Sequence, residues 1–335
     1  MRSLSDYLDY LGDEVVAVAG DPALPVGGAS NDSRTVAPGF MFVAVSGAGD
    51  DGHRYLDQAL AAGVRVVVSE RAQSLRLPAG VAAIKVRNAY AAAGLVAEVM
   101  HGFPARKLEL HGVTGTNGKT TTAFLLRDIL SGNGAEPVGL IGTVGYDCGT
   151  GLETASRTTP DPFALQEMFV RMVENGCRRA VLEVSSHALV QHRLGRARFA
   201  RALFTNLSGD HLDYHHTMEE YFRAKRRLFH DLLLPGGIAV LNGDDPYGRR
   251  LARELFCDRT LTWGRRRHDL DYHLRIVRAD LKGQTCQLTG SHEARRLFCP
   301  LVGDYNAENL AAAALTARSL GFSWPEIARA LARTA

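Results

Sequence analysis

The residues best suited to chemistry form a glycine-rich segment in the middle of the chain. It runs from Gly112 to Thr122 and reads Gly-Val-Thr-Gly-Thr-Asn-Gly-Lys-Thr-Thr-Thr. Glycines let a loop curl so that its backbone N–H groups point at phosphate oxygens, and a following helix N-terminus adds positive potential. We therefore expect Lys119 to reach the terminal phosphates of a nucleotide, and Thr120 or Thr121 to hold Mg²⁺.

The flanking residues supply the context that such a loop needs. Alternating apolar residues at Leu108, Leu110 and Val113 predict a strand before it, and residues 123–130 predict a helix after it. The spacing is Gly-x-x-Gly-x-x-Gly-Lys-Thr, because Val113 occupies the first glycine position of the strict phosphate-loop pattern. An ordinary glycine turn is the alternative, and the strand–loop–helix context favours phosphate binding.

Two further candidates follow predicted strands of the same block. Glu183 lies in the apolar run 180–184, where a carboxylate is either a Mg²⁺ ligand or half of a structural ion pair. His211 follows the run 202–207 and is flanked by Asp210 and Asp213. A lone histidine is more often structural, but a metal is already expected beside the phosphate loop.

Lys225 is a sharper case, because it falls within an apolar helical stripe. The stripe is formed by Tyr221, Phe222, Leu228, Phe229 and Leu232. A lysine there must extend its amine to solvent, pair with another group or be chemically altered.

Polar residues cluster after the strand that contains Glu183. Ser185 is not flanked by the glycines of a hydrolase nucleophile elbow, so the sequence gives little support for a catalytic triad. Binding of an anionic substrate by Arg193 and the nearby hydroxyls is more natural. Near the C-terminus, Asn306 and Asn309 precede an alanine-rich helix over 310–318, where they either cap the helix or contact a nucleotide.

The elements that position these residues divide into two blocks. Residues 1–104 alternate strand-like runs (41–45 and 64–69) with helical ones (53–62 and 89–100), which predicts a small α/β domain. Within it, residues 31–34 either bind a polar ligand edge or form an Asx turn. Residues 102–106 read as a linker. In residues 105–335 strands alternate with helices, which predicts a mainly parallel sheet with ligands at its carboxyl end.

Composition narrows the class of protein. The net charge of +3 gives no reason to expect nucleic acid, and 46% apolar residues suffice for two cores. Five widely spaced cysteines (Cys148, Cys177, Cys257, Cys286 and Cys299) indicate reduced thiols. No signal core and no apolar run of membrane-spanning length is apparent, so a cytoplasmic protein is expected.

Taken together, these segments resemble the Mur ligases, and most closely the members that add a diamino acid to a UDP-linked muramoyl dipeptide. The order and spacing of the motifs carry the resemblance over nearly the whole chain. The matching segments are residues 31–34 with 42–45, 115–122, 141–143, 158–160, 183–187, 189–193, 205–207, 210–215, 224–225 and 303–306.

The resemblance implies roles for individual residues. For ATP it implies Gly115, Thr116, Asn117, Gly118, Lys119, Thr120, Thr121, Asn306 and Asn309. For the substrate it implies Ser33 at the uridine diphosphate end, and Asn117, Thr158, Thr159, Ser185, Gln191 and Arg193 at the muramoyl-peptide end. Catalysis would fall to Lys119, Glu183, His211 and a carbamylated Lys225, with Mg²⁺ on Thr120, Glu183 and His211.

The implied fold is a small N-terminal UDP-binding α/β domain followed by a phosphate-loop ATPase-type domain. The implied reaction is ATP-driven amide formation between UDP-N-acetylmuramoyl-L-alanyl-D-glutamate and meso-diaminopimelate or L-lysine. That reaction belongs to peptidoglycan synthesis, and hence to cell-wall biogenesis, cell shape and division. A third, Rossmann-like domain typical of the family has no counterpart here, so we expect a monomeric fragment or truncated form with impaired turnover.

Two alternatives remain open at this point. One is a non-catalytic sugar-nucleotide-binding protein. The other is a ligase that adds glutamate to folate, which would share the phosphate loop but leave residues 31–34 and 158–160 unexplained.

Overall fold

The computed structural model describes residues 2–47, 51–72, 75–255 and 259–334. These described residues form two compact units. The first contains the residues up to Pro104, together with Pro160–Val170 and Gln191–Arg196. The second contains Ala105–Thr159, Arg171–Val190 and the residues from Ala197 onward. Two segments beyond the predicted boundary at 104/105 thus belong to the first unit.

The first unit is built on a mostly parallel sheet of strand order β2-β7-β6-β5-β4, in which β2 pairs antiparallel with β7. Its elements are β1 (Arg2–Ser3), α1 (Leu4–Leu11), β2 (Val15–Ala19), β3 (Pro25–Val26), β4 (Ala29–Ser30), β5 (Met41–Val43), α2 (Leu56–Ala61), β6 (Val66–Ser69), β7 (Ala82–Val86) and α3 (Ala89–His101). Short 3₁₀ turns lie at Gly12–Glu14, Gly52–Tyr55 and Pro104–Lys107.

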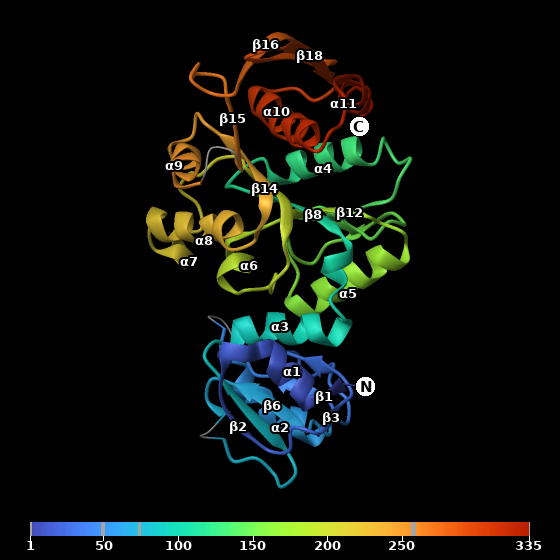
Figure 1. Cartoon of the computed structure of the whole chain (residues 1–335), viewed down its shortest axis with the longest axis vertical. Helices are drawn as coiled ribbons and strands as arrows, with labels where there is room; N and C mark the ends of the chain where they lie inside the picture. The colour runs from blue at the N-terminus through green and yellow to red at the C-terminus, as the bar shows by residue number, and fades with distance from the viewer. Residues whose placement is uncertain (1, 48–50, 73–74, 256–258, 335) are drawn as a thin grey trace. The chain divides into compact units, whose positions relative to one another are not determined.

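The two faces of this sheet pack against different helices, because successive side chains of a strand point to opposite faces. Met41 and Val43 belong to the core cluster shared with α1 and α3, whereas Phe42, between them, packs in the cluster that contains Leu56 and Ala59 of α2. Figure 1 shows α1 and α3 together beside this sheet. The predicted strands at 41–45 and 64–69 and the helices at 53–62 and 89–100 are confirmed, with small differences at their ends.

The second unit has a long sheet of order β11-β10-β9-β12-β8-β13-β14-β15-β16-β17-β18, parallel from β9 to β16 and antiparallel at both ends. Its strands are β8 (Glu109–Thr114), β9 (Val138–Ile141), β10 (Gly145–Asp147), β11 (Leu152–Thr154), β12 (Arg179–Glu183), β13 (Phe199–Phe204), β14 (Leu233–Asn242), β15 (Thr260–Gly264), β16 (Tyr272–Asp280), β17 (Gly283–Gly290) and β18 (Ala294–Cys299). Its helices are α4 (Lys119–Leu130), α6 (Ser186–Val190), α7 (Leu212–His215), α8 (Met218–His230), α9 (Pro246–Glu254), α10 (Asp304–Ser319) and α11 (Trp324–Leu331), and α5 (Pro162–Glu174) begins in the first unit.

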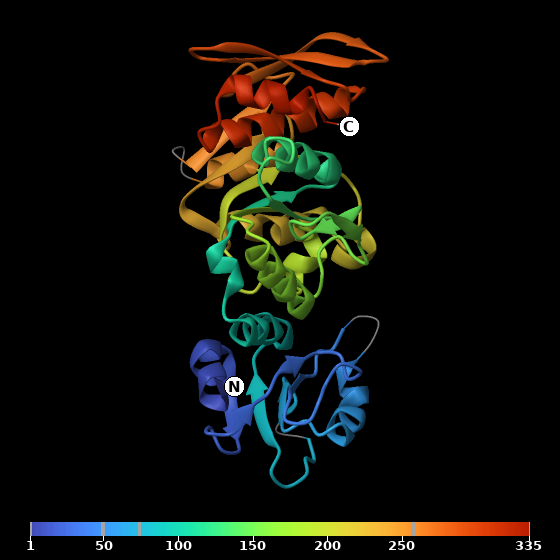
Figure 2. The same ribbon diagram turned by 90° about the vertical axis from the view of Figure 1, so that its right-hand side faces the viewer.

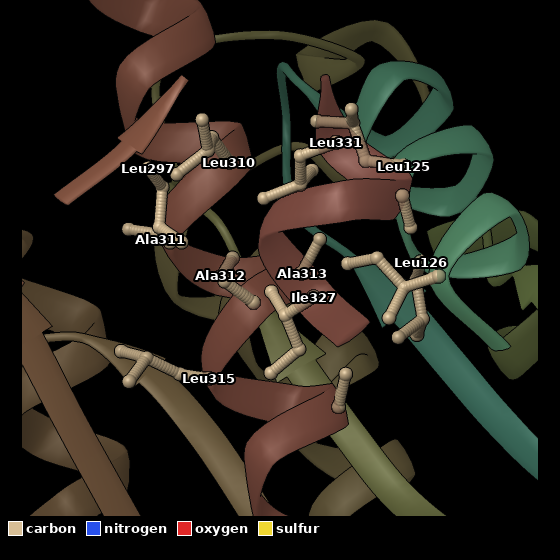
Figure 3. Packing of buried hydrophobic residues seen from close by; sticks show 14 of the residues in the cluster. Leu125, Leu126, Leu297, Leu310, Ala311, Ala312, Ala313, Leu315, Ile327 and Leu331 are labelled. Atoms are coloured by element: carbon tan, nitrogen blue, oxygen red, sulfur yellow. The ribbon is translucent and has the colours of Figure 1, made fainter. Parts of the chain in front are cut away.

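Apolar side chains of α10 and α11 pack against α4 to form the core on one side of this sheet. Figure 3 shows Leu310, Ala313 and Leu315 of α10 and Ile327 of α11 with Leu126 of α4, and all five are buried. Alanines along α10 allow the helices to approach closely, and this packing fixes the position of α4. Strands β16 to β18 form a ribbon beside α10 (Figure 2). This antiparallel part was not predicted from the sequence.

The remaining sequence predictions concern the thiols and the membrane. Cys148, Cys177, Cys286 and Cys299 are buried free thiols, and Cys257 lies outside the described residues. Burial raises the pKa of Cys177 and of Cys286 to about 11. Within the described ranges, no helix has both the length and the apolar character needed to cross a membrane.

Candidate functional site

The predicted phosphate loop lies between β8 and α4. Gly115 has φ +147° and Gly118 has φ +83°, and α4 begins at Lys119. These conformations favour glycine. A Cβ atom on Gly115 would lie 1.9 Å from the Thr205 hydroxyl oxygen, so a side chain has no room there. The loop therefore leads directly into the N-terminus of α4, where phosphate oxygens are stabilised.

Residues of the neighbouring strand end hold this loop in place. In parallel register β8 pairs with β13, and Thr205 and Asn206 directly follow β13. The Thr205 hydroxyl donates to the Asn117 carbonyl at 2.6 Å, and the Asn117 N–H donates to Oδ1 of Asn206 at 3.0 Å. These two residues were not predicted to have a role, although their position directly after a predicted strand is a signal that could have identified them.

Asn309 supports the loop from the side of α10. It is 4% exposed, and its Oδ1 accepts a hydrogen bond from the Thr122 hydroxyl at 3.2 Å. A Cβ atom on Gly118 would lie 2.2 Å from that Oδ1. Asn306 bonds to Asn309 and to the Val302 carbonyl. Both asparagines lie inside α10, whose N-cap is Gly303 and lacks a side-chain cap. The capping interpretation is therefore wrong.

Lys119 is held by the loop itself. Its Nζ donates to the carbonyl of Gly115 at 3.0 Å and to the carbonyl of Thr116 at 2.7 Å. Burial lowers the pKa of Lys119, while the negative charges of Glu183 and Asp210 oppose that shift. A cation held over the loop by carbonyls is ready to bind phosphate oxygens.

Lys225 is buried against the same loop. It lies on α8, is 1% exposed and donates from Nζ to the Gly115 carbonyl at 2.9 Å. Its Nζ also lies 4.5 Å from the centre of the Tyr221 ring. Extension of the amine to solvent is therefore excluded. Burial, and then the charge of Lys119, hold the pKa of Lys225 well below its usual value.

Glu183 ends β12 beside the loop and is fully buried. Its Oε2 accepts from the Thr120 hydroxyl at 3.0 Å, and its Oε1 accepts from the Thr143 N–H at 2.9 Å. Among the described residues no cation lies within ion-pair distance of this carboxylate, so the structural ion-pair interpretation is not supported. Thr143, two residues after the end of β9, therefore holds the Glu183 carboxylate through its N–H and its hydroxyl.

A cavity of about 270 Å³ opens in front of the loop. It collects most of the predicted residues of this unit. Its lining consists of Thr116, Asn117, Gly118, Lys119, Thr120, Thr143, Thr158, Ser185, Ser186, His211, Tyr221 and Lys225. Nine predicted nucleotide, metal and substrate residues of the second unit therefore face one space. The predicted residues outside its lining are Gly115, Thr121, Thr159, Glu183, Asn306 and Asn309.

The donors around this cavity fit Mg²⁺. The Thr120 hydroxyl and the Glu183 carboxylate are neighbouring oxygen groups of the kind that Mg²⁺ prefers, and Thr120 and His211 line the cavity. Within the described part of the chain, no group of three His, Cys, Asp or Glu side chains could hold a metal on its own.

The hydroxyls predicted to bind substrate differ in position. Thr158 lines the cavity and shares a 3.0 Å hydrogen bond with Thr143. Thr159 is buried behind it and donates to the Glu183 carbonyl at 2.8 Å. Ser185 lines the cavity and accepts from the Ala188 N–H at the start of α6, so it serves as a cap and not as part of a triad.

An aromatic and imidazole group adjoins Lys225 and was not predicted as a unit. His215 is 4% exposed, stacks on Tyr221 with ring centres 4.9 Å apart, and shares a 2.8 Å hydrogen bond between Nε2 and the Ser186 hydroxyl. Burial and neighbouring positive charges, first that of His187, lower the pKa of His215 to about 4. This group forms the wall beside Lys225.

The remaining predicted residues lie in the first unit. The Ser33 hydroxyl donates to Oε1 of Gln58 at 3.0 Å, and the Asp32 carboxylate accepts from the Arg34 N–H, which confirms the Asx turn. The Arg193 guanidinium donates twice to Oε1 of Gln191, at 3.0 and 2.6 Å.

Comparison with known families gives two matches along the chain. The model described as "Mur ligase family, catalytic domain" matches residues 25–103, and the model described as "Mur ligase middle domain" matches residues 113–317. The second match alone covers more than half of the chain.

Individual relatives agree with these matches. The chain is 37% identical over 336 residues to the UDP-N-acetylmuramoyl-L-alanyl-D-glutamate--2,6-diaminopimelate ligase of Chlorobium phaeobacteroides, covering 98% of this chain and 65% of that protein. A solved structure of a ligase with the same printed name superposes with a TM-score of 0.82 at 28% identity, over the whole of this chain and 67% of the other. A folate complex of FPGS shares the fold at 19% identity, with a TM-score of 0.56 over 72% of this chain.

Proposed function

Because this chain belongs to the Mur ligase family, we propose that it takes part in the ATP-dependent addition of a diamino acid to UDP-N-acetylmuramoyl-L-alanyl-D-glutamate. The diamino acid we propose is meso-diaminopimelate, ahead of L-lysine, because 2,6-diaminopimelate appears in the names of the relatives. The reaction would serve peptidoglycan precursor synthesis in the cytoplasm. The chain spans 65% of the length of its relative from Chlorobium phaeobacteroides.

One observation carries the proposal: two lysines converge on the phosphate loop. Lys119 and Lys225 both donate to the Gly115 carbonyl, at 3.0 and 2.9 Å, beside a cavity lined by hydroxyls. Phosphoryl transfer needs charge neutralisation and in-line positioning more than covalent chemistry from the protein. Lys119 and the loop N–H groups supply the first requirement.

The proposed reaction has two steps. A carboxylate oxygen of the D-glutamate attacks the γ-phosphorus of ATP, so that ADP leaves and an acyl phosphate forms. The amine of the diamino acid then attacks the acyl carbon, inorganic phosphate leaves with the C–O bonding electrons, and the new amide nitrogen loses a proton. Thr158 and Ser185 would orient the peptide in the cavity of the second unit, and Gln191 and Arg193 would bind its anionic end.

Mg²⁺, when bound, would neutralise charge on the transferring phosphoryl group. Thr120, Glu183 and His211 would hold it. Lys225 would react through its neutral amine, whose lone pair attacks the carbon of CO₂ and which then releases a proton to solvent. The product is a carbamate anion, and the lowered pKa of Lys225 favours the amine that this step needs.

The test is calorimetric titration with UDP-N-acetylmuramoyl-L-alanyl-D-glutamate, with UDP-N-acetylglucosamine and tetrahydrofolate as competing candidates. We expect saturable binding of the muramoyl dipeptide, weakened at least about tenfold by Arg193→Ala through loss of a charged hydrogen-bonding partner. Equal binding of UDP-N-acetylglucosamine would favour a general sugar-nucleotide-binding protein. Binding of tetrahydrofolate alone would overturn the proposal.

A further inference from the structure

Arg193 lies in a turn that belongs to the first unit, although the segments before and after this turn in the sequence belong to the second unit. The turn comprises residues Gln191–Arg196. The Gly195 N–H donates to the His192 carbonyl at 2.9 Å, and both residues have positive φ, +55° and +48°. A tight turn with a non-glycine residue at positive φ needs support from its surroundings.

Helix α3 provides part of that support through a close approach. A Cβ atom on Gly94 would lie 2.7 Å from the His192 carbonyl oxygen and 3.0 Å from Cα of Gly195. Since such distances are forbidden, only glycine lets the turn reach the helix surface. The absence of a side chain at Gly94 thus lets the backbone of His192 and Gly195, on either side of Arg193, lie against α3.

A buried carboxylate one helical turn further along α3 provides the other part of the support for this turn. Glu98 is 4% exposed on a helix whose buried residues are otherwise Ala, Gly, Leu and Val. Its Oε1 accepts from the Arg196 N–H at 2.7 Å, and its Oε2 accepts from the Tyr10 hydroxyl at 2.6 Å. Tyr10 in turn has the Arg196 guanidinium 4.7 Å above its ring and accepts from it at the backbone carbonyl at 3.1 Å.

Burying a carboxylate is costly unless donors compensate it, and both oxygens here are engaged in tying one turn to two helices. We propose that Glu98 is a positioning residue, which with Gly94 and Tyr10 fixes the turn 191–196 and so presents Arg193 to the anionic end of the muramoyl peptide. This inference rests on the proposed function. Bidentate recognition by arginine depends on a fixed backbone, because a shift of about 1 Å misplaces both N–H groups.

The experiment titrates UDP-N-acetylmuramoyl-L-alanyl-D-glutamate into the full chain and into Glu98→Gln, which places an NH₂ group against a donor. We expect about tenfold weaker binding, since one charged hydrogen bond is lost. Glu70→Gln is the matched control. Glu70 accepts from the Ala89 N–H at 2.8 Å at the start of the same helix and touches no residue of the turn in the structure described. This control should bind as the unaltered chain does.

A double-variant cycle separates positioning from general damage. If Glu98 acts through Arg193, Glu98→Gln should weaken binding less than about twofold in an Arg193→Ala background. An additive tenfold loss there would overturn the role, as would unchanged binding by Glu98→Gln alone. Tyr10→Phe, which removes only the hydroxyl, should give a smaller loss of the same kind if Glu98→Gln fails to fold. Absence of binding by the unaltered chain would instead overturn the proposed function, and this role with it.

Discussion

Two loops predicted to hold phosphate-bearing ligands are stabilised in opposite ways. The loop that contains Ser33 is held mainly by its own neighbours: Asp32 accepts from the Arg34 N–H at 2.9 Å and forms an ion pair with the Arg34 guanidinium, whose side chain is 80% exposed. The loop that contains Lys119 is held by residues far away in the sequence. Thr205, Asn309 and Lys225 each bond to it or to the helix that follows it.

Whether a loop is held by local or by distant residues determines how closely its function is coupled to the stability of the domain. A loop closed by local hydrogen bonds keeps its shape whatever the rest of the domain does. A loop closed by three separate elements keeps its shape only while the sheet and α10 stay packed. Substitutions near the phosphate loop should therefore affect folding and nucleotide binding together, whereas those at the exposed Arg34 should leave folding almost unchanged.

The strongest expected effect is that of Gly115→Ala. The new Cβ would meet the Thr205 hydroxyl at 1.9 Å in a backbone conformation that alanine rarely adopts. We expect the free energy of unfolding to fall by about 4 kcal/mol, with loss of ATP-analogue binding. Gly134→Ala is the control, since Gly134 also has positive φ but a Cβ there would meet nothing within 4 Å. Chemical denaturation giving equal losses for both variants would show that the packing around Gly115 is loose.

The second effect is a pH dependence that belongs to the wall of the phosphate-loop cavity. Since the pKa of His215 is lowered to about 4 in the folded state, the unfolded chain takes up a proton first as the pH falls from about 6.5. Stability is therefore lost between about pH 6.5 and pH 4, by about 3 kcal/mol in all. The free energy of unfolding, measured by denaturation at several pH values in this window, should change less with pH for His215→Gln than for the unaltered chain. An exposed-histidine control, His292→Gln, should retain the full slope, and an equal slope in all three proteins would contradict the assignment.

The same contrast explains what the sequence could predict. The Gly-Lys-Thr loop, the strand before it and the helix after it follow from local residue patterns, and the Asx turn at Asp32 follows from a local one too. The α/β class and the mainly parallel sheet were also predictable, because β8, β12, β13 and β14 are each followed by polar residues and then a helix.

The features of the fold and the site that were not predicted depend on contacts between residues far apart in the sequence, which no local pattern contains. Thr205 and Asn206 support the loop only because β13 pairs with β8. For Asn309 the sequence left helix capping and nucleotide contact as alternatives, because its burial against Gly118 depends on the packing of α10 on α4. The antiparallel ribbon of β16 to β18 was missed because its polar, arginine-rich strands lack the apolar runs of the parallel strands.

A third prediction tests the support from α10. Asn309→Ala leaves the fully buried Thr122 hydroxyl without its acceptor and opens a small space under Gly118. We expect a loss of about 2 kcal/mol in the free energy of unfolding, together with weaker binding of an ATP analogue. Asn306→Ala, in a less buried position of the same helix, should cost less than half as much. If Asn309→Ala weakened nucleotide binding with no loss of stability, its role would be direct contact and not support of the loop.

The smallest expected effect is that of Arg34→Ala in the first unit. The guanidinium is 80% exposed, and its pair with Asp32 is screened by water, so the free energy of unfolding should change by less than about 0.5 kcal/mol. The Asx turn survives, because the Arg34 N–H that Asp32 accepts belongs to the backbone. The pKa of Asp32 is lowered first by its hydrogen bond to Arg34, so any contribution of this pair is present above the ordinary aspartate pKa and is lost as the pH falls below it. Denaturation of Arg34→Ala at neutral pH checks this directly. A loss comparable to that of Asn309→Ala would mean that the loop around Ser33 also depends on distant packing, and the contrast between the two loops would fail.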